Sequence, residues 1–416
     1  MTADDTAPGA GRALRSGAPA PPRPGPAAPP AHIHARRTGT RIAERLADAA
    51  DALGAPDIVF AVSRRGHRTV HCGGVAPPPR GVPRDQWRYE IGSASKTFTG
   101  LLLADLVAAG RFAYDDVAAT RLAPHRPAGP PGNPATLLHL ITHTSGLPAF
   151  PADFYPQALP HWSTAPYAGY SAERVVAAYL RARPRHRPGT RWHYSNFGAS
   201  VLGHTLAAAT GTPWEDLIGH HVLAPLGLTG VRLHPCAERP AAPTSPSAPT
   251  SGHPFAPAPT PAPGADTSHA AEAHASAEAI ADARGYHRDG VTPVPALRMG
   301  GFQAAGAVRA TPGDLLSYLE AHLDPSRTPL SAALEAVRRP LLRRGRGHRH
   351  VHTLTWFQHL SSRGPLYFHG GATPGQQAFL GFRPATGTAV VALATRRVSL
   401  RDPFIATAYA LLDEME

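Results

Sequence analysis

Segments with β-strand character lie near both ends of the chain, while its middle carries helical patterns. Four of them lie in the last third, at residues 350–357, 365–369, 376–382 and 388–394. Three more lie near the N-terminus, at residues 57–63, 68–72 and 88–91. Glycine, proline and polar residues bound most of these runs, as is typical of strands joined by turns. The pattern predicts one antiparallel sheet built from both ends of the chain.

Helical patterns flank and separate these runs. Residues 97–109 are largely apolar and end at Gly110, which predicts a buried helix. Other helical patterns lie at residues 41–53, 136–142, 172–181, 197–210, 214–223, 313–323 and 331–337. Asp402 can cap a last helix that Pro403 opens. The order predicts an α+β fold, with an antiparallel sheet of about five strands or more flanked by helices and an inserted, mainly α-helical region.

Two stretches of low complexity interrupt this order. Residues 1–38 consist mainly of Ala, Pro, Gly and Arg, and residues 237–283 repeat Ala-Pro, Thr and Ser. We expect a disordered tail and a disordered insertion, because neither stretch can contribute to a core. We predict that residues 39–416 form one domain, which includes the insertion. Its α/β part covers about 39–110 and 284–416, and its helical region covers about 111–236.

The chain contains a single lysine. Lys and Arg together number 41 against 29 Asp and Glu, a net charge of +12, and Lys96 is the one lysine among them. Arginine supplies positive charge equally well, but its guanidinium does not release its proton in a protein. A lone lysine therefore indicates a site that needs an amine able to lose its proton. The alternative is chance survival on the surface.

Lys96 belongs to an S-x-x-K tetrad, Ser93-Ala94-Ser95-Lys96, at the start of the buried helix. Three residues are close to one helical turn, so the side chains of Ser93 and Lys96 lie on the same helix face. A neutral, desolvated amine can remove the proton of a serine hydroxyl and make it a nucleophile. The amides at the N-terminus of the helix can donate to an oxyanion.

Two further motifs carry polar groups that suit the same chemistry. In Tyr194-Ser195-Asn196, a tyrosine near a cation can have its phenol pKa lowered and can exchange protons with a serine, while the asparagine amide can hold a carbonyl. In His369-Gly370-Gly371-Ala372, two glycines let the backbone approach a ligand, so the amide of Ala372 could donate to an oxyanion. The alternatives are a helix start with an Asx cap and a plain turn.

In chain order, S-x-x-K, Y-x-N and H-x-G resemble the motifs of the penicillin-recognising serine hydrolases, which include class C β-lactamases, related esterases, D-aminopeptidases and DD-peptidases. Residues 89–100, Tyr-Glu-Ile-Gly-Ser-Ala-Ser-Lys-Thr-Phe-Thr-Gly, are similar to the family's nucleophile segment. Residues 137–148 and 224–228 are similar to two other family segments. The resemblance covers about 41–235 and 284–416 and implies the β-lactamase/transpeptidase-like fold.

The resemblance also implies roles for single residues. Ser93 would attack the substrate and carry its acyl group, and Lys96 and Tyr194 would form the general-base pair. Asn196 would steer the substrate, and the amides of Ser93 and Ala372 would form the oxyanion hole. His369 and Gly371 complete the substrate-binding set.

His369 stands where the antibiotic-hydrolysing members carry a lysine. Because a histidine is mostly neutral at pH 7, recognition of a substrate carboxylate is weakened at this position, and relatives with histidine are similar to esterases and acyltransferases. We therefore expect a serine hydrolase acting on a small ester or amide, with acyl transfer as a variant. Alternatives are a thioesterase or cyclase for carrier-bound chains, a true β-lactamase or D-aminopeptidase, and an inactive binding module on the same fold.

No metal or cofactor is expected. His348, His350 and His352 alternate along one run, but they follow an arginine-rich stretch without a carboxylate, which favours a solvated basic edge. Cys72 and Cys236 exclude a disulfide framework.

The expected partner is a small ester, amide or acyl substrate, and an acidic carrier domain is a further candidate because of the positive charge. Nucleic acid is not expected, since the arginines are spread over tails and loops without interleaved aromatic residues.

The sequence contains no run of eighteen apolar residues, so no membrane span is predicted. Its acidic start, Met1-Thr2-Ala3-Asp4-Asp5, is unlike a secretion signal. These features favour a cytoplasmic location.

Overall fold

The computed structural model describes residues 31–77, 82–123, 134–233, 280–344, 350–399 and 401–415. The chain divides into a unit of residues 1–41 and a unit of residues 42–416. Most of the two stretches expected to be disordered, residues 1–30 and 234–279, lies outside the described residues, as does His348. Helix α1 covers Ala31–Asp51, so it begins well before the start expected at Arg41.

The principal sheet has eight strands in the order β2-β1-β13-β12-β11-β10-β9-β8, and all its pairs are antiparallel. Its members are β1 Ile58–Arg64, β2 His67–Gly73, β8 Leu342–Arg344, β9 His350–His352, β10 Phe357–His359, β11 Leu366–Ala372, β12 Gln377–Arg383 and β13 Thr388–Ala394. Strands β1 and β13 pair in register from Ile58↔Ala394 to Arg64↔Thr388. The two ends of the sequence therefore meet in one sheet, which confirms the α+β prediction.

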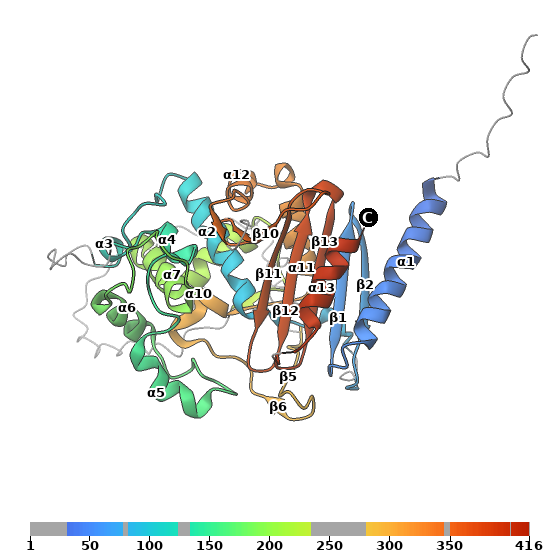
Figure 1. The fold of residues 1–416 in the computed structure, drawn as a ribbon, viewed down its shortest axis with the longest axis horizontal. Helices are drawn as coiled ribbons and strands as arrows, with labels where there is room; N and C mark the ends of the chain where they lie inside the picture. The colour runs from blue at the N-terminus through green and yellow to red at the C-terminus, as the bar shows by residue number, and fades with distance from the viewer. Residues whose placement is uncertain are drawn as a thin grey trace, which may run out of the picture. The chain divides into compact units, whose positions relative to one another are not determined.

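Both faces of this sheet are covered, which explains why β1 and β13 are apolar along most of their length. In β1, Val59 and Ala61 belong to one buried cluster, while Ile58, Phe60 and Val62 belong to another. Helix α13, Phe404–Glu414, covers the second cluster together with the part of α1 from Ile42 onward. Helix α11, Pro312–Leu323, packs on the other face, as Figure 1 shows.

Two predicted strands differ from the observed ones. The run 350–357 divides into β9 and β10, because Thr353 N–H donates to Trp356 O at 3.0 Å and closes a turn between them. The run 88–91 shortens to β3, Tyr89–Glu90, which joins a separate three-stranded sheet with β7, Val308–Ala310, and β4, Arg232–Leu233. A two-stranded ribbon of β5, Gly285–Tyr286, and β6, Pro293–Val294, lies between β4 and β7 in the sequence.

The middle of the chain is helical, as predicted. Its helices are α3 Ala118–Leu122, α4 Leu137–Ile141, α5 Tyr155–Ala158, α6 Ala172–Arg181, α7 Asn196–Thr210 and α8 Trp214–Ile218. Helix α7 lies among α3, α4 and α6 (Figure 1). The segment predicted as one helix over 214–223 ends its α-helical part at Ile218 and continues as a wider π turn over Gly219–Leu223.

The buried helix expected at 97–109 is α2, Ser95–Ala108. It is contacted by α7, α8, α12 (Ser331–Ala336) and α10 (Gln303–Gly306). Its apolar composition follows, because neighbours on several sides leave little of its surface exposed.

Residues 280–283, assigned above to the disordered insertion, form part of the ordered core. Arg88 N–H donates to Ala281 O at 2.9 Å, and Ala283 N–H donates to Arg88 O at 2.8 Å. This short segment extends the strand that leads to β3, so its order comes from backbone pairing that its composition does not reveal. Among the described residues, no helix is both long and apolar enough to cross a membrane.

Candidate active site

Ser93 lies in a tight turn between β3 and α2. The turn covers Gly92–Ala94 and leads directly into α2 at Ser95. Gly92 has φ +49°, and a Cβ there would lie 2.6 Å from Ala372 O, while a Cβ on Gly371 would collide with Ile91 O. The glycines therefore let the end of β11 pack directly against the turn that carries Ser93.

This packing brings two backbone amides to one place. Thr373 N–H donates to Gln376 O at 2.9 Å, so in the alternating antiparallel pattern the amide of Ala372 points away from β12. On that other side β10 pairs only with Leu366–Phe368, which leaves this end of β11 facing the turn. The amide of Ser93 lies in a first helical turn, where amides lack an intrahelical acceptor.

Lys96 lies one turn further along, with 1% of its surface exposed. Its Nζ donates to Ala305 O at 2.7 Å and lies 5.0 Å from the centroid of the Tyr194 ring. No described carboxylate lies within ion-pair distance of it. Burial lowers the pKa of Lys96 to about 7, because the charged form loses its hydration without gaining an anion. A large fraction of this amine is therefore neutral at physiological pH.

Tyr194 approaches from the loop before α7. Burial raises the pKa of its phenol, and the hydrogen bond with the Ser93 side chain acts in the opposite direction. A nearby cation can lower the pKa of a tyrosine, but at Tyr194 burial dominates and the net shift is upward. In the free protein the phenol is protonated, so the neutral amine of Lys96 is the group available to accept a proton.

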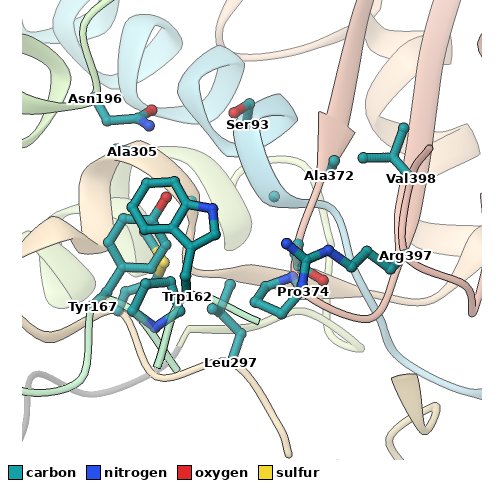
Figure 2. A pocket seen from close by; sticks show the side chains of 15 residues that line it. Ser93, Trp162, Tyr167, Asn196, Leu297, Ala305, Ala372, Pro374, Arg397 and Val398 are labelled. Carbon is teal, nitrogen blue, oxygen red and sulfur yellow. The ribbon is translucent and has the colours of Figure 1, made fainter. Parts of the chain in front are cut away.

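A cavity of about 160 Å³ opens at Ser93. Asn196 and Ala372 line it, so the structure brings these predicted residues together with the serine (Figure 2). The rest of the wall is mostly apolar and comes from distant segments: Trp162, Pro166, Tyr167, Leu297, Met299, Ala305, Thr373, Pro374, Arg397 and Val398, with Gly92 and Gly306. Apart from Gly92, which belongs to the segment 89–100, sequence motifs did not reveal these wall residues, because most of them stand in loops without a recognisable local pattern.

His369 is placed differently from its expected position in the substrate-binding set. It does not line the cavity at Ser93, but shares a second cavity of about 10 Å³ with Lys96 and His143. Its Nδ1 lies 2.7 Å from Gly370 O. Burial, and then the positive charge of Lys96, lower the pKa of His369 to about 3, so it is neutral at physiological pH. The ring is a buried neighbour of Lys96 that lines the smaller cavity.

His143 is a site residue that the motif analysis did not single out. It has φ +60°, which is strained for a residue with a side chain. Its carbonyl accepts from His193 N–H at 2.8 Å and its Nδ1 accepts from Ser195 N–H at 3.3 Å, while its ring lies 4.5 Å from that of Tyr194. His143 therefore holds the loop that positions Tyr194. The sequence feature that could have identified His143 is its position in residues 137–148, the segment that is similar to a family segment.

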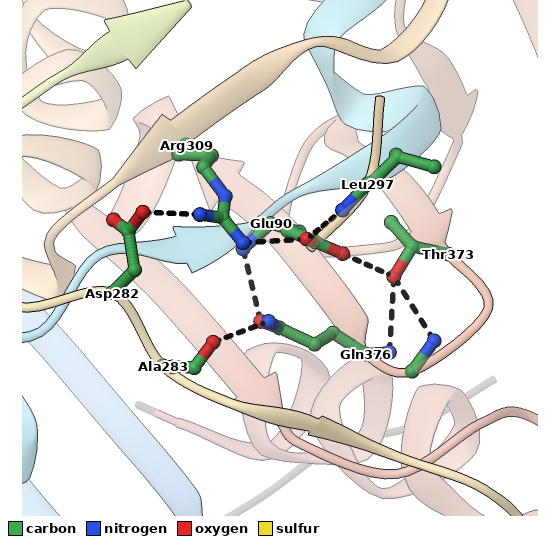
Figure 3. A network of polar contacts seen from close by, with 8 residues as sticks. Glu90, Asp282, Ala283, Leu297, Arg309, Thr373 and Gln376 are labelled. Atoms are coloured by element: carbon green, nitrogen blue, oxygen red, sulfur yellow. Dashed lines mark hydrogen bonds and ion pairs between the residues drawn. The ribbon is translucent and has the colours of Figure 1, made fainter. Parts of the chain in front are cut away.

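A buried polar network joins the nucleophile strand to the cavity wall (Figure 3). Glu90 Oε1 accepts from Leu297 N–H at 2.8 Å and from Arg309 Nη2 at 2.5 Å, and Glu90 Oε2 accepts from Thr373 Oγ1 at 2.7 Å. Arg309 also pairs with Asp282. Since Leu297 and Thr373 line the cavity, this one carboxylate ties two segments of its wall to the strand that leads to Ser93.

The remaining histidines form no metal centre in the described part of the chain, where no group of three or more His, Cys, Asp or Glu side chains is suited to hold a metal ion. His350 Nδ1 lies 3.3 Å from His359 Nε2 at the surface, while His352 is buried against Trp192. Cys72 is a free, exposed cysteine.

Comparison with known proteins gives a consistent family. The family model described as Beta-lactamase matches residues 42–414. A beta-lactamase of Pseudomonas fluorescens is 33% identical over 140 residues, which cover 34% of this chain and 35% of that protein. Penicillin-binding protein 4* of Bacillus subtilis is 28% identical over 146 residues, 35% of this chain and 30% of that protein. These alignments span about a third of the relatives' own lengths.

Solved structures show the same fold over a longer range. A class C beta-lactamase superposes with a TM-score of 0.68 at 20% identity, covering 93% of this chain and 98% of that chain. A D-alanine carboxypeptidase from Burkholderia cenocepacia superposes with a TM-score of 0.65 at 22% identity, covering 92% and 99%. The chain therefore has the β-lactamase/transpeptidase-like fold that the motifs implied.

Proposed function

Because this chain belongs to the beta-lactamase family, we propose that it is a serine hydrolase that forms an acyl-enzyme on Ser93 with a small ester or amide substrate. The single observation that carries the proposal is the arrangement of Lys96. It is a buried amine with a pKa of about 7, one helical turn after a serine that contacts Tyr194 and opens onto a cavity.

In the proposed mechanism the neutral amine of Lys96 takes the proton of Ser93 Oγ, directly or through the phenol of Tyr194. Oγ attacks the substrate carbonyl, and the amides of Ser93 and Ala372 stabilise the oxyanion. Collapse breaks the bond to the leaving group, which receives the proton through Lys96 or Tyr194. Water then attacks the acyl-serine under the same base, releasing the acid and regenerating Ser93. An alcohol or amine in place of that water would make the reaction an acyl transfer.

Several features favour ester or amide hydrolysis over the alternatives. His369 is neutral and enclosed, so it offers no fixed charge of the kind that a lysine would supply there. The complete set of Ser93, Lys96, Tyr194 and two directed amides supports a catalyst over an inactive binding module. A thioesterase acting on carrier-bound chains would use the same chemistry, and the net charge of +12 would suit an acidic carrier.

The experiment is covalent labelling with a fluorophosphonate probe, followed by intact-mass spectrometry. Wild type should gain one adduct on Ser93, and Ser93→Ala should gain none. Lys96→Arg should label at least ~100-fold more slowly, because the charge is kept but no neutral base remains. Ser145→Ala is a control: Ser145 is a buried serine whose Oγ accepts from Leu147 N–H, and its loss should leave the adduct in place. Labelling of Ser93→Ala, or fast labelling of Lys96→Arg, would refute the mechanism.

A further inference from the structure

One wall of the cavity at Ser93 continues into a short helical segment with an apolar outer face. Residues 155–161 are helical, first as α5 and then as a 3₁₀ turn, and Trp162 keeps helical backbone angles. Tyr155, Leu159 and Trp162 recur along this segment at the spacing of one helix face. Their side chains are 40%, 64% and 42% exposed. Trp162 also lines the cavity, so this outer face begins at the cavity itself (Figure 2).

A layer of aromatic rings supports the outer face from below. The ring of Phe150 lies 6.1 Å from that of Tyr155 and 6.2 Å from that of Trp162, edge to face in both cases. Phe150 in turn stacks on the buried ring of Phe154 at 4.6 Å. The two exposed rings are therefore held in place before any ligand arrives, which lowers the entropic cost of binding to them.

Packing within the described residues does not require this face to be apolar. The opposite side of the segment supplies the buried contacts, since Phe154 and Ala158 are fully buried. A helix at the surface of a protein usually turns polar side chains outward. Single exposed apolar residues are ordinary, but three on one face beside a catalytic cavity form a patch of the kind that binds ligands.

The volume of the cavity indicates what would lie on this patch. The cavity holds about 160 Å³, less than the roughly 300–1,000 Å³ of pockets that enclose a drug-sized ligand. It therefore has room for the reacting carbonyl and its nearest atoms, but a longer chain has to leave it. The wall beside Trp162 is apolar as well, with Tyr167, Leu297 and Met299. A chain that leaves past Trp162 thus stays on apolar surface.

We propose that the outer face binds an apolar chain of the substrate, which leaves the cavity at Trp162 and lies along Leu159 and Tyr155. The inference rests on the proposed hydrolase function and narrows its substrate class to esters or amides with a hydrocarbon chain longer than the cavity can hold. From Tyr155 to Trp162 a helix rises by about 10 Å. Each methylene group that lies on this length is removed from water on one side, which favours binding of longer chains.

The test uses two series of esters at concentrations too low to form micelles. Nitrophenyl acetate, butyrate, hexanoate and octanoate vary the acyl chain, while methyl, butyl and octyl acetate vary the alcohol. In at least one series wild type should show a kcat/KM about tenfold or more higher for the octanoyl or octyl ester than for the butyryl or butyl ester, because each half-covered methylene group contributes about twofold. The series with the preference identifies the end of the substrate that carries the chain.

Leu159→Ser should lower this ratio about threefold or more, mainly through KM, and adding Tyr155→Ser should bring it close to one. Leu360→Ser is the matched control. It makes the same change at 62% exposure, in the turn after β10, at a residue that does not line the cavity. Its ratio should stay at the wild-type value. Equal ratios in Leu159→Ser and Leu360→Ser would contradict the inference.

A wild type without a chain-length preference in either series would overturn the inference, and an intact fluorophosphonate adduct on Ser93 would show that the hydrolase proposal survives. Phosphatidylcholine vesicles provide the remaining arm. If wild type co-sediments with them, Leu159→Ser does not, and neither ester series shows a preference, the outer face binds a lipid surface and the inference is wrong. If no ester is cleaved and the adduct is missing as well, both proposals fail together.

Discussion

The surroundings of Lys96 give a physical reason for the survival of one lysine in an arginine-rich chain. Its amine is buried and forms no ion pair with a described carboxylate, so its pKa falls to about 7. An arginine in the same place would stay charged, because its guanidinium does not deprotonate in proteins. The proposed mechanism needs a neutral amine at this position. Replacing Lys96 by arginine would therefore remove the catalytic base, although the positive charge would be kept.

A pH dependence follows from this pKa. Below about pH 7 the amine carries its proton and cannot act as a base, and above it the neutral form dominates. The rate of fluorophosphonate labelling should therefore rise with pH with a midpoint near 7, falling about tenfold for each unit below it. His369 does not interfere, since its pKa of about 3 lies outside this range.

Labelling rates measured between about pH 5 and pH 9 test this expectation. Lys96→Arg should lose the rising limb together with most of the rate. A flat profile for wild type, or a midpoint near the ordinary lysine value of about 10, would contradict the assignment of Lys96 as the base.

At the scale of elements, the site depends on how closely the end of β11 approaches the turn before α2. Gly371 faces Ile91 O, and Gly92 faces the backbone of Ala372, so each element has a glycine where the other needs space. The space between the two backbones at these glycines is too small for even one added methyl group. Because an oxyanion donor must lie within hydrogen-bond distance of the reacting oxygen, this contact determines whether the amides of Ser93 and Ala372 can act together.

Gly371→Ala should therefore damage catalysis. The added methyl group forces β11 away from the turn, and the loss of one oxyanion donor typically costs about 100-fold or more in rate. Labelling of Ser93 should slow by that factor. We expect some loss of thermal stability as well, because overpacking strains the backbone.

Gly370→Ala is the control in the neighbouring position. A Cβ there would meet Ile405 Cδ1 at 3.3 Å, the end of a flexible side chain on α13, so labelling should stay within about twofold of wild type after a small shift. Equal rates for both variants would show that the approach of β11 does not control the reaction.

At the scale of the whole molecule, the site lies where segments far apart in the sequence converge. Strand β1 pairs with β13 across the sheet, and the Glu90 network links β3, β7, the residues around 282 and the turn after β11. Arg309 and Glu90 are both almost fully buried. One buried ion pair therefore helps to hold the nucleophile strand, the cavity wall and the sheet in one arrangement.

Glu90→Gln should destabilise the whole fold. It leaves the buried Arg309 with only the more exposed Asp282, and an incompletely paired buried charge costs about 2–4 kcal/mol. Urea unfolding should show this loss in the free energy of unfolding. Arg45→Ala provides the comparison, because Arg45 and Glu414 form a pair at the surface, which is worth about 1 kcal/mol or less. If the two variants lost similar amounts of unfolding free energy, the Glu90 network would stabilise the fold no more than a surface ion pair does.

Much of this protein was predictable from local patterns. Residues 388–394 and 172–181 occur as the strand and the helix that were expected. The spacing of Ser93 and Lys96 placed both at the start of a buried helix, and the glycines after His369 marked a close approach of backbone. Such features are local: they depend on periodicity, on turn chemistry and on the backbone freedom of glycine, which are properties of a few consecutive residues.

Other properties depended on distances that the sequence does not state. The direction of the pKa shift at Tyr194, the enclosure of His369 and the short pairing of β3 are set by burial and by partners hundreds of residues away. The same holds for Arg397, which only the folded chain places in a cavity with Ser93. Sequence alone thus determined the elements and the nucleophile motif, and tertiary packing decided protonation and the shape of the pocket, because both depend on which distant groups exclude water from a given atom.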